Sequence, residues 1–330
     1  MKIITLEEHF IDLELAKASG PTLNRLSPYF AAAYTAGNEL NSPSQETLLE
    51  VGERRIADMD ANGITTQVLS CLWAQQAPAD VAPALVRNAN DTAAAAIEAF
   101  PGRFAAFAAL PTAAPEAAAR ELARCVSELG FVGTLINGRT DDEFLDAPRF
   151  DPVLAAASRL RVPIYLHPSL PPRVVSETSY ERGLDPLVGA RFQTGAWGWH
   201  VETAEHFIHL VLSGVFDRYP ELQVILGHWG EMIPFYLDRL EGLLPQSITK
   251  LDRPFTDYFT QNVYITPSGM WNQARLQFCV ETLGVDRIIY AVDYPFIGNE
   301  GAVSFLEEAN LSTEDKNKIA HTTAEKLLGL

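Results

Sequence analysis

The stretch Ile3-Ile4-Thr5-Leu6-Glu7-Glu8-His9-Phe10 begins as a short apolar run and ends in two acids and a histidine. Successive side chains of a strand point to opposite faces, so regular alternation places Glu7 and His9 on one face and Glu8 on the other. A carboxylate and an imidazole that leave the end of a first strand together supply half of a metal site. The alternative is an exposed acidic turn after an edge strand, and the rest of the chain must decide.

The same alternation of strand and helix continues along all 330 residues. Near-continuous apolar runs alternate with amphipathic helical patterns, which is typical of a parallel sheet covered on both faces. No Gly-x-Gly-x-x-Gly follows an early strand, so a dinucleotide-binding fold is not favoured. The pattern therefore predicts one α/β domain over residues 1–330, a single (β/α)₈ TIM barrel. We expect its eight strands at residues 3–10, 65–70, 104–109, 132–136, 162–166, 223–226, 263–266 and 287–292.

Two long excursions follow the first and fifth expected strands, at residues 10–45 and 169–198. Active sites of (β/α)₈ barrels are built at the carboxyl ends of the strands, so these long loops are expected to lie over the mouth of a site. The pattern also predicts a short helix over residues 13–18 and continuous helices over residues 45–62 and 231–244.

Composition excludes several classes of protein. The net charge of −17 argues against a nucleic-acid groove, because phosphate binding needs a basic surface. No apolar stretch reaches the roughly 18 residues of a membrane helix, and no basic region followed by an apolar run begins the chain. Cys71, Cys125 and Cys279 are odd in number and far apart, which suits reduced thiols. A cytoplasmic protein that spans no membrane is the expectation.

Ionisable side chains recur where the expected strands end. Glu7 and His9 follow the first strand, His167 the fifth, His228 the sixth and Asp293 the eighth. Each has an ordinary alternative: a core histidine, a histidine bonded to a backbone carbonyl, or an aspartate that caps a turn. Because the carboxyl ends of barrel strands meet at one mouth, four strand ends that deliver acids and imidazoles favour a shared site.

Four segments resemble the metal-dependent amidohydrolase superfamily: Glu7-Glu8-His9-Phe10, Tyr165-Leu166-His167-Pro168, Ile225-Leu226-Gly227-His228-Trp229-Gly230-Glu231 and Asp293-Tyr294-Pro295-Phe296. Within it they are similar to a branch of non-oxidative decarboxylases. That branch includes the decarboxylases of γ-resorcylate, 2,3-dihydroxybenzoate, 5-carboxyvanillate and aminocarboxymuconate semialdehyde. Residues 11–45 and 71–76 match no single member, so the resemblance does not predict the exact acid.

The resemblance implies one divalent metal ion and no organic cofactor. Its ligands would be Glu7, His9, His167 and Asp293, a set of carboxylates and imidazoles that suits Zn²⁺ or Mn²⁺. The expected fourth strand ends Ile136-Asn137-Gly138-Arg139, without the bridging lysine of binuclear members. A single ion is therefore expected.

The resemblance also implies roles around the metal. His228, held by Glu231, would contact the substrate, and Arg239 would lie near the substrate, supplied in this branch by a neighbouring subunit of a homodimer or homotetramer. The alternative for Arg239 is a solvated helix face. Expected aromatic walls, whose alternative is plain core, are Trp197, Trp199, Tyr294 and Phe296. His200 lies beside them without an expected role, and His206 and His209 are expected to be structural.

The implied activity is that of a carbon–carbon lyase: cofactor-free decarboxylation of an ortho-hydroxylated aromatic carboxylic acid. Asp293 would protonate the ring carbon before CO₂ leaves, because direct expulsion would place a carbanion in the ring plane. The alternative keeps the site and hydrolyses an amide, lactone or vinylogous carbonyl with metal-activated water, Asp293 acting as base. A third possibility is a barrel that binds a metal or ligand without catalysis.

Overall fold

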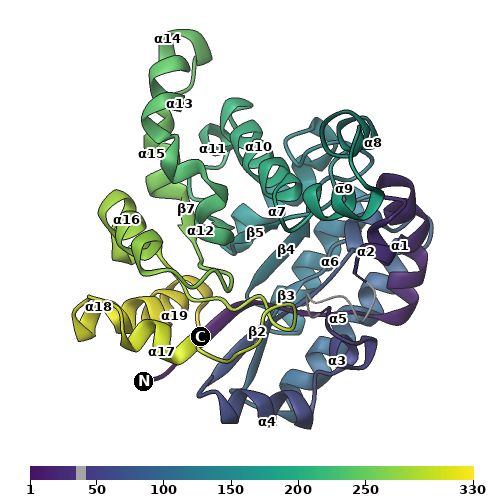
Figure 1. The fold of residues 1–330 in the computed structure, drawn as a ribbon, viewed down its shortest axis with the longest axis vertical. Coiled ribbons are helices and arrows are strands. Elements are labelled where there is room, and N and C mark those ends of the chain that lie inside the picture. Colours follow the sequence, from purple (N-terminus) through teal and green to yellow (C-terminus); the bar gives the residue numbers. More distant parts are fainter. Residues whose placement is uncertain (35–41) are drawn as a thin grey trace.

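The computed structural model describes residues 1–34 and 42–330, and over these residues seven strands form one curled parallel sheet. Each strand pairs with the next along the chain, so the spatial order is the sequence order (Figure 1). The α/β prediction is confirmed. The strands are β1 Ile4–Phe10, β2 Thr66–Cys71, β3 Phe104–Ala108, β4 Gly133–Asn137, β5 Ile164–His167, β6 Val224–Leu226 and β7 Val263–Ile265.

The expected eighth strand is not formed as a strand. Residues 287–292 run between β7 and β1 and meet them only through isolated bridges, Ile288 with Ile265 and Ala291 with Leu6. The Leu6 amide donates to the Tyr290 carbonyl oxygen at 2.9 Å. This buried segment therefore links both ends of the sheet without a continuous ladder, and it carries Asp293 toward the end of β1.

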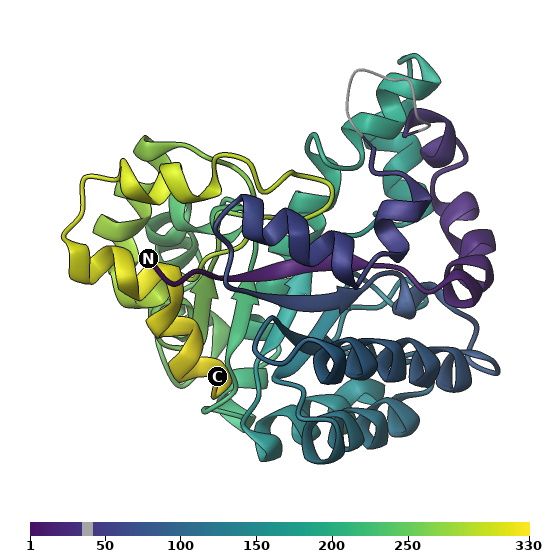
Figure 2. The same ribbon diagram turned by 90° about the horizontal axis from the view of Figure 1, so that it is seen from below.

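Helices between the strands pack on the sheet (Figure 2). In α6, Pro115 begins the helix where its missing N–H costs nothing. Ala118, Leu122 and Cys125 then form a buried stripe at three- and four-residue spacing. The principal helices are α4 Glu53–Ala61, α5 Ala82–Ala99, α6 Pro115–Glu128, α7 Asp151–Leu160, α10 Gly198–Leu212, α11 Val215–Arg218, α15 Phe255–Asn262, α16 Gln273–Leu283, α17 Ala302–Glu307, α18 Thr313–Asn317 and α19 Thr323–Leu328.

The excursion after β1 is more helical than predicted. The expected short helix is the 14-residue α1 Leu13–Leu26, which Asp12 begins by accepting a hydrogen bond from the Leu15 amide. The expected helix over residues 45–62 is two helices, α3 Gln45–Leu49 and α4, because the backbone at Gly52 is not helical. Helix α2 Phe30–Ala33 lies between α1 and α3, and residues 35–41 of this excursion are outside the described residues.

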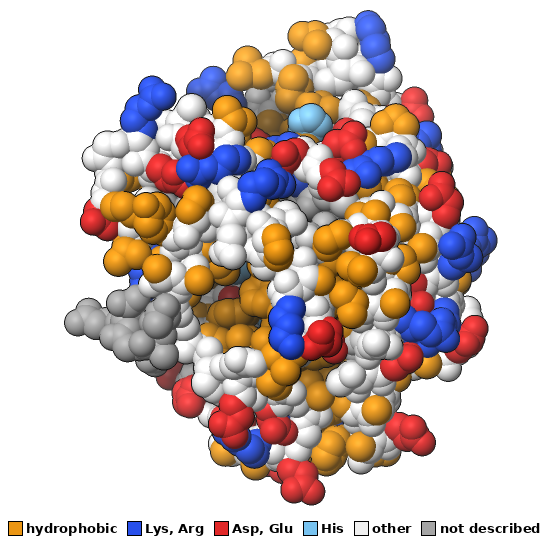
Figure 3. All heavy atoms as spheres, turned by 90° about the vertical axis from the view of Figure 1, so that its right-hand side faces the viewer, with side chains coloured by type: hydrophobic (Ala, Val, Ile, Leu, Met, Phe, Trp, Pro, Cys, Tyr) orange, Lys and Arg blue, Asp and Glu red, His pale blue; other side chains and the backbone are white. Residues whose placement is uncertain are grey.

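The excursion after β5 holds α8 Arg173–Val175, a π-helical turn Ser176–Glu181 and α9 Pro186–Phe192. Figure 3 shows the face over these helices and α1, where both signs of charge are interspersed around a hollow lined by apolar side chains. Among the described residues, no helix is long and apolar enough to cross a membrane.

The predicted helix over residues 231–244 is also interrupted. The range holds the end of the turn α12 His228–Glu231, the 3₁₀ turn Ile233–Phe235 and α13 Leu237–Leu243. A separate helix, α14 Gln246–Thr249, follows it. The cause is a run of five residues, 228–232, with positive φ. Only glycine adopts such angles without cost, so this strained loop is held by its surroundings. It carries His228 and Glu231 out of β6.

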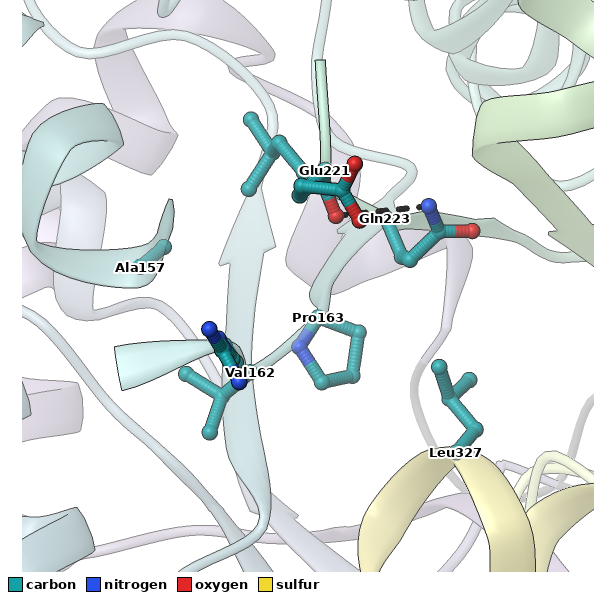
Figure 4. A pocket seen from close by; sticks show the side chains of 8 residues that line it. Ala157, Val162, Pro163, Glu221, Gln223 and Leu327 are labelled. Carbon is teal, nitrogen blue, oxygen red and sulfur yellow. Dashed lines mark hydrogen bonds between the residues drawn. The ribbon is translucent and has the colours of Figure 1, made fainter. Parts of the chain in front are cut away.

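The two ends of the sheet differ in chemistry. At the amino ends of β5 and β6, Val162, Pro163, Glu221 and Gln223 line a small cavity of about 90 Å³ together with Leu327 (Figure 4). The ionisable residues expected to act together lie at the opposite, carboxyl ends of the strands.

Candidate metal centre and active site

Glu7 and His9 reach the same site by a route that the sequence did not predict. The ladder between β1 and β2 shifts register between Thr5 and Glu8, and Glu7 has a φ of 67°. This irregularity re-aims one side chain, as a β-bulge does. Regular alternation along β1 was therefore the wrong reason for pairing Glu7 with His9, because the bulge interrupts it.

Four side chains direct one donor atom each into a common space. The donor atoms of Glu7, His9, His167 and Asp293 lie within 4.8 Å of one another. His9 Nε2 is 3.1 Å from Asp293 Oδ1, and His167 Nε2 is 3.4 Å from Glu7 Oε1. The two imidazole rings stand edge to face, with centroids 4.5 Å apart. Segments far apart in the sequence, β1, the end of β5 and the residue after 292, thus converge as expected.

The atoms that face this space are unsatisfied. Glu7 Oε1 and His9 Nε2 are buried without a hydrogen-bond partner among the described residues. Buried polar atoms nearly always have a partner, so two such atoms side by side mark a place for a ligand. Two carboxylates and two imidazoles are ligands that Zn²⁺ and Mn²⁺ accept. The four residues therefore fit a divalent metal ion.

The outer nitrogens of both histidines are held. His9 Nδ1 is 2.9 Å from Ser70 Oγ. His167 Nδ1 lies 2.8 Å from the Pro168 carbonyl oxygen, to which it donates. A carbonyl oxygen can only accept, so His167 carries its hydrogen on Nδ1 and keeps the Nε2 lone pair for a metal. The Ser70 hydroxyl can donate or accept, and it holds the orientation of the His9 ring.

Glu7 is held in the same manner. Its Oε2 accepts hydrogen bonds from Tyr165 and Ser268, and Thr266 Oγ1 lies 2.9 Å from the Tyr165 hydroxyl. The hydroxyl groups of Tyr165 and Ser268 thus occupy one oxygen of the carboxylate, and Thr266 supports both of them. Oε1 is thereby left as the free ligand atom.

Burial dominates the electrostatics of the cluster. It raises the pKa of Glu7 to about 7, against the lowering effect of His228, and it raises the pKa of Asp293 to about 7. It also lowers the pKa of His9 to about 3 and that of His167 well below its usual value. Both imidazoles are therefore neutral, which is the form that binds metals. A divalent cation would supply the positive charge that the two carboxylates lack.

Glu8 is not part of the cluster and bonds to the backbone next to Asp293. It accepts hydrogen bonds from the amides of Val292 at 3.1 Å and Tyr294 at 3.2 Å, on either side of Asp293. The buried Arg55 donates to the His9 carbonyl oxygen at 2.8 Å, and its guanidinium lies 4.7 Å from the Tyr294 ring centroid. Glu8 and Arg55 thus position the segments that carry the ligands.

His228 and Glu231 stand beside the cluster. His228 Nδ1 and Glu231 Oε1 are 2.8 Å apart, and His200 Nδ1 lies 2.8 Å from the other oxygen, Oε2. Burial disfavours charge on His228, but Glu231 and Glu7 outweigh it and raise its pKa to about 10. Burial disfavours charge on Glu231 as well, yet His200 and His228 hold its pKa below the usual value.

Some of the remaining predicted residues lie beside the cluster, and others lie on the surface. The Phe296 ring lies 5.8 Å from the His9 ring, and Trp199 Nε1 donates to His200 Nε2 at 3.2 Å. Trp197 is 46% exposed. Arg239 is exposed on α13 and makes no hydrogen bond or ion pair with a described residue, so one chain does not bring it into the cluster.

Sequence reasoning missed several residues that support the site. Tyr165 was detectable, because it lies two residues before His167 and so shares its face of the strand. Ser268 and Glu8 gave no such signal, since their contacts depend on how distant segments meet. His206 accepts a hydrogen bond from the Leu145 amide at 2.9 Å and is structural, as expected.

Known proteins share this architecture. The family model described as amidohydrolase matches residues 51–330. The chain is 37% identical to decarboxylase orsB of Emericella nidulans, over 99% of this chain and 96% of that protein. It is also 37% identical to a γ-resorcylate decarboxylase of Polaromonas, over 99% and 98%.

Solved structures agree with these relatives. A 2,6-dihydroxybenzoate decarboxylase in complex with 2,6-dihydroxybenzoate superposes with a TM-score of 0.83 at 33% identity, covering all of both chains. A 5-carboxyvanillate decarboxylase from Novosphingobium aromaticivorans, solved with manganese, gives a TM-score of 0.90 at 32% identity, over 100% of this chain and 96% of the other. The chain therefore belongs to the amidohydrolase family, in the branch of decarboxylases that its strand-end residues resemble.

Proposed function

We propose that this protein is a metal-dependent, non-oxidative decarboxylase of an ortho-hydroxylated aromatic carboxylic acid. The observation that carries the proposal is the set of donor atoms from Glu7, His9, His167 and Asp293, two of which are buried without partners. Full-length relatives at 37% identity that are decarboxylases support the same reaction.

The four residues would hold one Mn²⁺ or Zn²⁺ ion, and the manganese in solved relatives favours Mn²⁺. When bound, the ion would neutralise and orient the carboxylate and the adjacent hydroxyl oxygen of the substrate. Glu8 holds the backbone on both sides of Asp293, which keeps that carboxyl beside the place where the substrate ring would lie.

Asp293 is the proton donor in this proposal. In the metal-free site, burial opposes ionisation of its carboxyl group and raises the pKa to about 7. A carboxyl group beside the ring carbon can act as a general acid. Its proton forms a C–H bond at the ring carbon that bears the carboxylate. The bond from that carbon to the carboxylate then breaks, its electron pair restores the aromatic ring, and CO₂ leaves. Each turnover consumes one proton.

His228 orients the substrate. Its Nδ1 is bound to Glu231, so Nε2 on the opposite edge of the ring is left to donate to a substrate oxygen. Phe296 and Trp199 are proposed as walls for the aromatic ring, with Tyr294 and Trp197 beside them.

The finer structural expectations belong to the proposal as well. We infer a closed (β/α)₈ barrel in which residues 287–292 take the place of the eighth strand. The exposed Arg239 would act in the site of a neighbouring subunit of a homodimer or homotetramer. A cytoplasmic location stays a prediction.

The test is metal analysis of the purified protein, followed by a panel of hydroxybenzoates read out by CO₂ release. Isotopically labelled water separates decarboxylation from hydrolysis, since label should enter the product as a ring hydrogen in the first case and as oxygen in the second. A metal-replete protein that releases no CO₂ from any acid of the panel would refute the proposal.

A further inference from the structure

Glu231 depends on two histidines for its orientation. The side chain is buried, and its oxygens are each 2.8 Å from an imidazole nitrogen, Oε1 from His228 Nδ1 and Oε2 from His200 Nδ1. No backbone N–H of the described residues donates to this carboxylate. His228 lies three residues from Glu231 in the same strained loop, whereas His200 comes from α10, which packs against it (Figure 1). His200 is therefore the contact that ties the carboxylate to the rest of the fold.

The outer edge of His200 faces one donor and one acceptor. Trp199 Nε1 lies 3.2 Å from His200 Nε2, and an indole N–H can only donate. The Gly195 carbonyl oxygen is also 3.2 Å from Nε2, and it can only accept. A neutral His200 bonds to Trp199 and a protonated one bonds to Gly195, and in both forms Nδ1 carries the hydrogen that Glu231 accepts. The link to Glu231 is thus kept whichever form is present.

Loss of the hydrogen bond between His200 and Glu231 would leave the orientation of Glu231 and His228 unfixed. A buried carboxylate oxygen without a donor is costly, so Glu231 would turn or recruit water to satisfy Oε2. Either response changes the direction in which Oε1 faces His228. The His228 ring, whose Nδ1 hydrogen points at Oε1, would then be free to turn, and the edge that faces the substrate would point in another direction.

We propose that His200 is a positioning residue for the decarboxylation proposed above, which holds Glu231 in the orientation that directs the His228 ring toward the substrate. The role is specific to this histidine of α10. His206, on the same helix, bonds to the Leu145 amide, and His209 is exposed near Asp146.

Two polar substitutions separate this role from simple packing. His200→Asn keeps an N–H near the position of Nδ1 and can still donate to Glu231. His200→Gln places its amide near Nε2 and gives up that bond. We expect kcat of His200→Gln to fall on the order of 10- to 100-fold with little change in KM, and His200→Asn to retain most of kcat. His209→Gln is the matched control and should leave both constants unchanged.

A second readout does not need turnover. In Zn²⁺-loaded protein with ¹⁵N-labelled histidine, the His228 Nδ1 signal should keep the position set by its hydrogen bond to Glu231 in the unmodified protein and in His200→Asn, and should move in His200→Gln. If no acid is decarboxylated but the His228 signal moves as expected, the proposed function fails while the role of His200 in orienting His228 stands. Equal kinetics and equal His228 signals in the Asn and Gln variants would overturn the inference.

Discussion

Removal of a single hydroxyl group, in Tyr165→Phe, should weaken metal binding while the fold is kept. The Tyr165 ring is fully buried and packs near Phe107, with centroids 5.9 Å apart. Phenylalanine preserves that packing. The substitution removes the donor to Glu7 Oε2, so the carboxylate is held by Ser268 alone and gains freedom to turn away from the metal position.

The expected magnitude follows from the bond that is lost. A hydrogen bond to a charged group contributes about 1.5–3 kcal/mol, and about 1.4 kcal/mol corresponds to a tenfold change in affinity. Hydrogen bonds from Ser268 and Tyr165 oppose the burial that raises the pKa of Glu7, so the variant should also bind a competing proton more tightly. Together these effects predict metal binding weakened by about 10- to 100-fold.

Calorimetric titration of the chelator-treated protein with Mn²⁺ measures this change directly. Tyr290→Phe is the matched control, because Tyr290 is equally buried but its hydroxyl donates to the Ala302 carbonyl oxygen, outside the cluster. Circular dichroism should show that both variants fold. The reasoning is refuted if Tyr165→Phe binds Mn²⁺ as tightly as the unmodified protein, or if Tyr290→Phe is weakened to the same extent.

Three further predictions concern the carboxyl groups. Glu7→Gln should lose bound metal, whereas Glu8→Gln should retain it, because both Glu8 oxygens bond to backbone amides outside the metal position; metal analysis yielding the reverse result would overturn the ligand choice. Asp293→Asn should fold but release CO₂ at least about 10²-fold more slowly, since an amide supplies no proton; near-normal release would exclude Asp293 as the donor. Burial raises the pKa of Glu7 and of Asp293 to about 7 from ordinary values of 4.5 and 3.8, so the folded, metal-free protein retains protons that the unfolded chain has lost. This stabilisation is present below the ordinary values and is lost as the pH rises through 7. Because metal binding needs the ionised carboxylates, the gain in Tm on adding Mn²⁺ should grow from about pH 6 to about pH 8, and a gain that shrinks over that range would contradict the assignment.

Local sequence patterns predicted the strands, the fold class and the residues that share one end of the sheet. Buried parallel strands are apolar runs, so the seven strands and the α/β class were predictable from one segment at a time. Residues at the carboxyl ends of those strands share one end of the sheet, which is why Glu7, His9, His167 and Asp293 could be grouped before their distances were known. Helix ends were less predictable, since the break at Gly52 and the left-handed loop at residues 228–232 interrupt patterns that continue past them.

Strand register and contacts between distant segments were decided only by the tertiary structure. The bulge at Glu7 arises where β1 meets β2, the hydroxyl groups of Tyr165 and Ser268 meet at Glu7 from segments 103 residues apart, and Glu8 finds its partners 284 and 286 residues away. Such hydrogen bonds depend on directions and distances that exist only once the sheet has formed. The sequence by itself thus determined the fold class and which residues share the end of the sheet, whereas the tertiary structure decided which atom of each residue is held and which is left free for a metal.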